Sequence, residues 1–100
     1  MLTRSLFVRL EAKPGREKEV AAFLQQGLEL ANREETTPVW FATQFGPTTF
    51  AIIDAFRDDA ARQRHLDGPI AKALMAKAPD LLVGAPTIEP MDVLGAKLPR

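Results

Sequence analysis

The sequence lacks several residue types on which common protein sites depend. It contains no cysteine, which excludes disulfide frameworks, thiolate metal sites and cysteine nucleophiles. Its 13 basic and 13 acidic residues cancel, so we expect no binding to nucleic acid or to a membrane surface. No apolar run approaches the roughly 20 residues of a membrane span, and Arg4 and Arg9 interrupt the N-terminal segment before it reaches signal-peptide length. We therefore expect a soluble, cytoplasmic protein.

Apolar periodicity predicts four strands and three helices within one domain, 1-100. A chain of 100 residues buries only about two thirds of its unfolded surface, so its core gains from a partner. Pro79 is predicted to end the last helix, and Pro90 places the last strand at a sheet edge because proline lacks the N–H that a ladder needs. The predicted strands cover 2–12, 39–45, 49–56 and 87–95, and the predicted helices cover 16–32, 58–66 and 70–77.

This order predicts an α+β fold of the ferredoxin-like βαββαβ type. It has a four-stranded antiparallel sheet in the order 4-1-3-2, with its helices on one face. A tight turn at Gly46 between the two middle strands pairs Phe41 with Asp54, and Trp40 and Gln44 then lie on the other face. Both faces of this hairpin are mostly apolar, whereas a face exposed to water alternates apolar with polar residues. We therefore expect a second copy of the chain to cover the free face, giving a homodimer.

His65 and Asp54 are the candidate catalytic residues. His65 is the only histidine, and it could act as a general acid or base near neutral pH or donate a hydrogen bond to a developing oxyanion. A structural role is the favoured alternative, because no partner lies near it in the sequence. Asp54 stands in an apolar strand, where burial raises a carboxyl pKa unless a partner compensates. It could orient His65 or accept a proton, but pairing with Arg9, Arg57 or Arg62 is favoured.

Trp40 and Gln44 are candidate binding residues. They share the predicted face of the hairpin with Ala42, Ala51 and Ala55, and these small residues leave room for a flat aromatic ligand against the indole. A partner subunit could fill the same space with its own side chains, and this alternative is slightly favoured.

Several short segments carry a family resemblance over essentially the whole chain. They are Lys13-Pro14-Gly15, the strand Phe50-Ala51-Ile52-Ile53-Asp54-Ala55-Phe56, the segment Ala60 to Leu66 with Gly68-Pro69, and Lys97-Leu98-Pro99. In these segments the chain resembles the antibiotic biosynthesis monooxygenase superfamily of dimeric ferredoxin-like proteins.

The resemblance implies a dimeric α+β barrel in which two sheets pack face to face and the last strand reaches toward the partner. It also implies a pocket between sheet and helices, where relatives oxidise phenols, anthrones or quinols with molecular oxygen. Asp54 and His65 match the acidic residue of the third strand and the histidine of the following helix, while Ile70 stands where many members have a second histidine. The resemblance also includes a haem-degrading branch, which needs an axial histidine further along the chain. Residues 70–77 contain no histidine, so haem binding is not expected.

The function predicted on these grounds is a cofactor-independent monooxygenase acting on a small aromatic. His65 and Asp54 are its predicted catalytic residues, Trp40, Gln44 and Phe41 its predicted substrate-binding residues, and no cofactor or metal is expected. An alternative is a non-catalytic small-molecule-binding or stress-response dimer, suggested by the missing second histidine. A third is an isomerase or decarboxylase that transfers a proton in the same pocket without oxygen.

Overall fold

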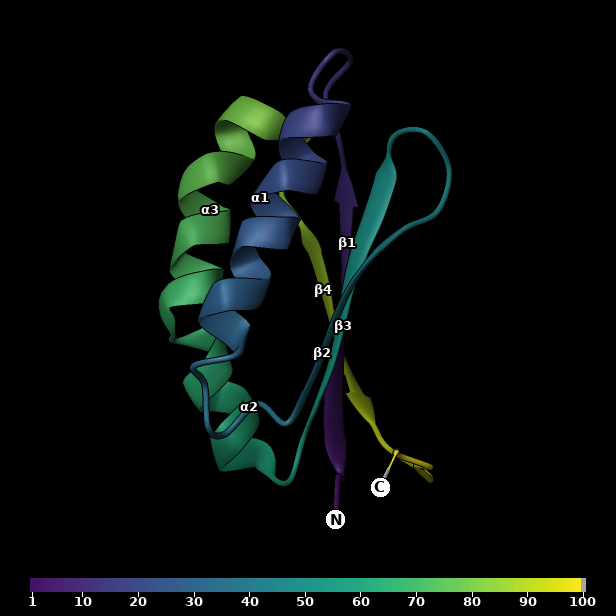
Figure 1. Cartoon of the computed structure of the whole chain (residues 1–100), viewed down its shortest axis with the longest axis vertical. Helices are drawn as coiled ribbons and strands as arrows, with labels where there is room; N and C mark the ends of the chain where they lie inside the picture. Colours follow the sequence, from purple (N-terminus) through teal and green to yellow (C-terminus); the bar gives the residue numbers. More distant parts are fainter. Residues whose placement is uncertain (100) are drawn as a thin grey trace.

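A four-stranded antiparallel sheet carries three helices on one of its faces (Figure 1). This computed structural model describes residues 1–99. The strands lie in the order β2-β3-β1-β4, so the predicted ferredoxin-like α+β fold and sheet order are confirmed. Along the chain the elements are β1 (Arg4–Glu11), α1 (Glu17–Ala31), β2 (Val39–Gln44), β3 (Thr49–Phe56), α2 (Asp59–Leu66), α3 (Pro69–Leu81) and β4 (Thr87–Asp92).

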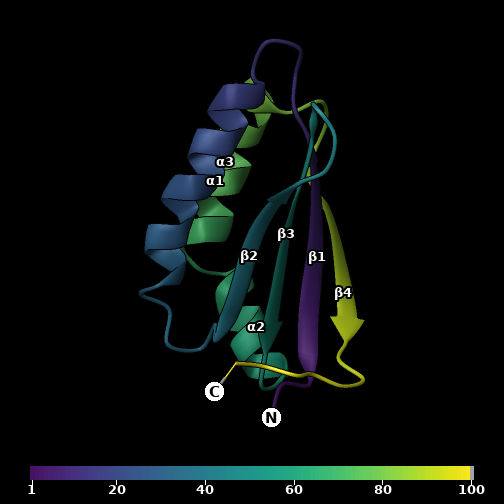
Figure 2. The same cartoon turned by 45° about the vertical axis from the view of Figure 1, so that its right-hand side comes forward.

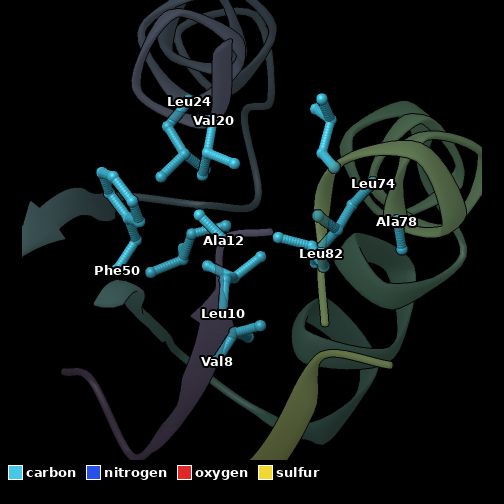
Figure 3. Close-up of a cluster of buried hydrophobic side chains, with 11 residues drawn as sticks. Val8, Leu10, Ala12, Val20, Leu24, Phe50, Leu74, Ala78 and Leu82 are labelled. Carbon is cyan, nitrogen blue, oxygen red and sulfur yellow. The ribbon is translucent and has the colours of Figure 1, made fainter. Parts of the chain in front are cut away.

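The main core lies between the sheet and helices α1 and α3. Side chains alternate across a strand, and Leu6, Val8 and Leu10 of β1 accordingly point under the helices and are buried. The apolar stripe of α1 packs onto Val8 and Leu10 at helical spacing, with α3 completing the layer, while Leu6 packs against Phe56 and Ala61. Figure 3 shows this cluster, which includes Val20, Leu24, Phe50, Leu74, Ala78 and Leu82.

Helix α3 is longer than predicted, because Pro79 does not end it. Proline removes one helical N–H and crowds the carbonyl four residues earlier, which costs about 3 kcal/mol in a helix interior. Pro79 lies in the last turn, between Ala78 and Leu81, which are each only 6% exposed in the core. Burial of these two neighbours offsets the cost, and the helix continues to Leu81. At its other end the helix begins at Pro69, a first position where the missing N–H of proline costs no hydrogen bond.

The register of the β2–β3 hairpin differs by one residue from the prediction. Trp40, and not Phe41, lies opposite Asp54, and Phe41 lies opposite Ile53. A shift of one residue moves every side chain of a strand to the other face. Trp40 therefore lies under the helices together with Asp54, while Phe41 lies on the open face.

The reason for the shift is the length of the hairpin loop. The Phe45 N–H donates to the Thr49 carbonyl over 2.9 Å, which leaves three residues in the loop. Gly46 has a φ of 93°, a conformation that side-chain-bearing residues rarely adopt. Thr48 accepts a hydrogen bond from the Ala12 N–H over 2.8 Å, so the loop is tied to the chain that follows β1. A two-residue turn would not make this contact.

The face of the sheet opposite the helices is open in the single chain (Figures 1 and 2). Its apolar side chains include Phe41, Phe45, Ile53 and Met91, which are 57%, 44%, 37% and 39% exposed. The Arg9 guanidinium lies over the Phe45 ring, 5.0 Å from its centre. The homodimer expected from this face stays a prediction. No helix in residues 1–99 has the length and apolar character needed to cross a membrane.

Candidate functional site

His65 lies between two carboxylates at one end of the covered sheet face. Its Nδ1 is 2.6 Å from Oε1 of Glu34, and its Nε2 is 3.0 Å from Oδ2 of Asp54. The side chains of His65 and Asp54 are 6% and 0% exposed, so both charges are withdrawn from water. We call Glu34, Asp54 and His65 the ionic cluster. Asp54 thus pairs with His65. The pairing with an arginine that was favoured from the sequence is wrong.

Three separate segments bring the ionic cluster together. Asp54 belongs to β3, and His65 lies near the end of α2. Asp58 caps the start of α2, since its carboxylate accepts from the Ala61 N–H over 2.8 Å. Glu34 lies in the connection between α1 and β2, where the Thr37 hydroxyl donates to its Oε1 over 2.8 Å. The turn from Glu34 to Thr37 therefore holds the second carboxylate against the imidazole.

Glu34 and Thr37 were not found from the sequence. They lie in a polar connection with no periodicity, and Glu34 is separated from His65 by 31 positions. The only sequence signal was the acidic pair Glu34-Glu35 just before the hairpin, and a loop carboxylate is more often solvated than buried.

The ionic cluster shifts the titration of two of its members. Burial by itself lowers the pKa of His65, but the close contacts with the Asp54 and Glu34 carboxylates and their negative charge outweigh it and raise this pKa above its ordinary value of 6.5. Burial raises the pKa of Asp54 above its ordinary value of 3.8, and the contact with His65 opposes this without cancelling it. The two carboxylates therefore favour an imidazolium between them, and Asp54 is a stronger base than a carboxylate in water.

Several buried polar atoms of this region have no hydrogen-bond partner within residues 1–99. The Asp54–His65 contact has the distance of an ion pair but not the alignment of a hydrogen bond, so neither oxygen of Asp54 is satisfied. The Nε1–H of Trp40 is also buried and unpartnered. Trp40 and Asp54 are directly opposite in the sheet, where side chains lie about 4.5–5.5 Å apart at Cβ. A donor and an acceptor that make no hydrogen bond thus belong to opposite residues on the same face of the sheet.

A cavity of about 160 Å³ lies between α1, α3 and the sheet, and Trp40 forms part of its wall. Gly27 of α1 lies against this ring, since a Cβ there would be 3.4 Å from Cη2 of the indole, an ordinary contact distance. The Trp40 ring is therefore the nearest neighbour of α1 at this position. Apart from Gln26 the lining is apolar: Phe23, Leu24, Gly27, Leu30, Trp40, Ile52, Ile70, Ala73 and Leu74.

The structure brings together some of the predicted site residues and separates others. His65 and Asp54 are in contact, and Trp40 lies beside Asp54. Phe41 lies on the opposite face of the sheet, so its placement beside Asp54 was wrong. Gln44 lies under the helices but lines a different hollow, with Phe50 and residues of α1.

Two other features were considered as sites. A hollow of about 440 Å³ lies between the two terminal segments, and Arg57 is the only charged side chain that lines it. It contains no acid or histidine, so it offers no proton chemistry. Residues 1–99 contain no group of three or more histidine, cysteine or acidic residues placed to hold a metal ion. In the ionic cluster the two carboxylates contact different nitrogens of the ring.

Comparison with known proteins adds a family to this geometry. No known family model matches the chain, and no curated protein matches it. A solved structure of a protein of unknown function from Nitrosomonas europaea is 56% identical, with a TM-score of 0.97, and the match covers 100% of this chain and 97% of that one. The chain belongs to the family of this protein.

Members of a second group share the fold of this family. Structures described as "putative antibiotic biosynthesis monooxygenase", from Nitrosomonas europaea and Caulobacter crescentus, match with TM-scores of 0.81 and 0.80 at 14% and 18% identity. The matches cover 92% and 94% of this chain and 90% and 92% of theirs. At such identities the likeness shows the fold. The resemblance to antibiotic biosynthesis monooxygenase structures is thereby confirmed as a shared ferredoxin-like fold.

Proposed function

We propose that this protein is a cofactor-independent monooxygenase that oxidises a small aromatic of the phenol, anthrone or quinol type with molecular oxygen. The observation that carries the proposal is the apolar cavity against Trp40, with the Asp54 carboxylate, which accepts no hydrogen bond, and its ion-pair partner His65 next to it. The fold shared with structures described as putative monooxygenases supports it.

The cavity suits a flat aromatic molecule. Its lining is apolar, so an aromatic ring is favoured over water, and the indole of Trp40 offers a surface for offset or edge-to-face contact. Ile52 lines the cavity, and Asp54 is the next residue of β3 on the same face. A hydroxyl on the Trp40 side of a bound ring would therefore approach the carboxylate.

The ionic cluster supplies a base at this point. Asp54 accepts the hydroxyl proton, and its raised pKa makes the transfer easier than it would be to an ordinary carboxylate. The Nε1–H of Trp40 donates to the oxyanion that develops, while His65 orients the Asp54 carboxylate from the other side. The apolar walls keep water from the anion.

Oxygen then reacts with the electron-rich anion. The phenolate gives one electron to dioxygen, and the resulting phenoxyl radical and superoxide combine at the ring carbon para to the oxygen, forming a C–O bond. The proton at that carbon moves to the distal oxygen of the peroxide as the O–O bond breaks, and the hydroxide so released takes up the proton held by Asp54. The balance is one phenol and one dioxygen converted to one benzoquinone and one water.

The test is oxygen consumption by the purified protein with phenols, hydroquinones and anthrones. We expect protein-dependent uptake, and a loss of about 100-fold or more in Asp54→Asn, because a positioned base contributes about 10²–10⁴ to rate. Asp80→Asn, at an exposed position of α3, is the matched control and should retain full activity. Full uptake by Asp54→Asn would contradict the role given to this residue.

A second candidate is a non-catalytic binder of the same ligands. It is favoured by the fact that neither Asp54 nor His65 itself lines the cavity and that the apolar Ile70 does. Saturable binding of an aromatic without oxygen uptake above autoxidation would support this function. Product formed without oxygen would instead indicate an isomerase or decarboxylase.

The proposal includes a homodimer formed through the open face of the sheet. Phe41 and Ile53 are opposite each other on this face and are 57% and 37% exposed, which favours burial against a second copy. Sedimentation should give a dimer, and Phe41→Asp should give a monomer. Leu28→Asp is the control, because Leu28 is 45% exposed on α1, away from the sheet face. A monomeric wild type would contradict the dimer.

A further inference from the structure

We infer that the ligand of the Trp40 cavity is a neutral phenol with a single ring, whose hydroxyl bridges Nε1–H of Trp40 and the carboxylate of Asp54. This narrows the proposed function to one class of substrate, and for the oxidation step it rests on that function. The binding claim stands on the volume and lining of the cavity and on the polar groups next to it.

The volume of the cavity matches one aromatic ring. It measures about 160 Å³, and an apolar protein cavity of about 150 Å³ takes up benzene. Its walls belong to the packed interior, since Leu24, Ile70 and Leu74 are 4%, 5% and 6% exposed. Close-packed walls do not yield without strain, so a second fused ring would have to extend past them toward the exposed Gln26. Fused-ring ligands such as anthrones should therefore bind more weakly than a single ring.

Two polar groups next to the cavity select a hydroxyl. Trp40, in the cavity wall, offers only a donor, and Asp54, the next inward residue of β3 after the wall residue Ile52, offers acceptors; neither side chain makes a hydrogen bond within residues 1–99. A hydroxyl is the smallest group that accepts from one and donates to the other. A ligand without it leaves both atoms unsatisfied, which is why sites built around a hydroxyl reject analogues that lack one.

The charge near the cavity selects a neutral ligand. Asp54 and Glu34 are both acidic, and they share the single cation of His65. A ligand carboxylate would add a further negative charge to a region withdrawn from water, where like charges repel strongly. Benzoate, which has the ring but carries a negative charge, should therefore bind far more weakly than phenol.

The single tryptophan makes a direct test possible. In 15N-labelled protein the only indole Nε1–H signal comes from Trp40, so its chemical shift reports on this cavity alone. Titrations under nitrogen would use phenol, toluene, benzoate and 1-naphthol. We expect a saturable downfield shift with phenol, at least tenfold weaker binding of toluene and benzoate, and weaker binding of 1-naphthol than of phenol.

Two glycine variants provide a matched pair. Gly27→Ala places a methyl group in the cavity wall, 3.4 Å from the indole, and should weaken phenol binding at least tenfold while the helix remains folded. Gly95→Ala adds the same group where no atom lies within 4 Å, and phenol binding should be unchanged. Equal binding by the two variants would overturn the assignment of the ligand to this cavity.

The outcomes separate this inference from the proposed function. Equal or tighter binding of 1-naphthol, or no shift of the Trp40 signal with phenol, would overturn the single-ring assignment, even if larger aromatics support oxygen uptake. Saturable phenol binding without any oxygen uptake would overturn the oxidation and leave the ligand assignment in place.

Discussion

The covered face of the sheet has two neighbouring regions of opposite character, with Trp40 between them. On one side is the cavity, which is apolar and holds about 160 Å³ of space. On the other is the ionic cluster, where His65 contacts Asp54 and Glu34 at 3.0 and 2.6 Å. The difference shows how one strand can serve both binding and proton transfer, because successive inward residues of β3 are apolar Ile52 and acidic Asp54.

The two regions should also respond differently to substitution. The ionic cluster is a set of mutually dependent charges, so removing one member leaves the others buried without compensation. The cavity has no such dependence, and its walls tolerate small changes in volume at modest cost.

The largest effect is expected at the centre of the ionic cluster. His65→Ala removes the only cation between two carboxylates, and breaking a buried pair in this way typically costs about 3–5 kcal/mol. Urea unfolding measures the loss. Arg64→Ala, which removes an exposed cation from the same helix, should cost less than about 1 kcal/mol. Equal losses of unfolding free energy in the two variants would show that the ionic cluster contributes no more to stability than an exposed charge does.

A smaller effect is expected for Glu34→Gln. The amide keeps the shape of the side chain but removes the charge from the hydrogen bond to Nδ1 of His65, and hydrogen bonds to charged groups contribute about 1.5–3 kcal/mol. The same variant should lower the pKa of His65, because one of the two groups that raise it is neutralised. An unchanged histidine titration by NMR would contradict the contact.

Stability should fall as the pH rises above neutrality. The folded protein holds its His65 proton above the ordinary pKa of 6.5, so this contribution is complete below 6.5 and is lost as the pH rises through the raised pKa. The contribution of Asp54 to stability is also lost as the pH rises above 3.8, because the pKa of this carboxyl is raised on folding. One proton gives a slope of at most about 1.4 kcal/mol per pH unit. In His65→Ala the fall in stability above pH 6.5 should disappear. If stability still fell above pH 6.5 in this variant, groups other than His65 would be responsible.

The smallest effect is expected at the cavity, and it has the opposite sign. Gly27→Ala should stabilise the protein by up to about 1 kcal/mol, because glycine is a poor residue for a helix interior and the added methyl makes ordinary contact with Trp40. Thermal unfolding measures the gain. A loss of stability would show that the wall cannot accept a methyl group. The combination of higher stability and weaker ligand binding would mark Gly27 as a residue that makes room for a ligand.

Most of the fold could be predicted from the sequence because its signals are local. The alternation in β1, the cap at Asp58 and the proline of β4 each specify their element within a few residues. The extent of α3 could not be predicted, because the cost of Pro79 is outweighed by burial that depends on the tertiary fold. The hairpin register also failed, since it depends on a loop contact with the chain after β1.

The site was predictable only in part, for a similar reason. His65 and Asp54 stood out by residue type, as a sole histidine and an acid in an apolar strand. Their third partner, Glu34, comes from a loop whose position is set by the packing of α1 against the sheet, which no local pattern encodes. The one-residue change of register decided which aromatic residue accompanies Asp54, and it replaced Phe41 with Trp40.

The most direct test of the account is an NMR titration of the only histidine with and without saturating phenol. If the cavity and the ionic cluster form one site, the ligand hydroxyl donates to Asp54 and draws its charge away from the imidazole, so the pKa of His65 should fall on binding. An identical His65 titration in the presence and absence of bound phenol would contradict the account, because it would show that the two regions do not act together.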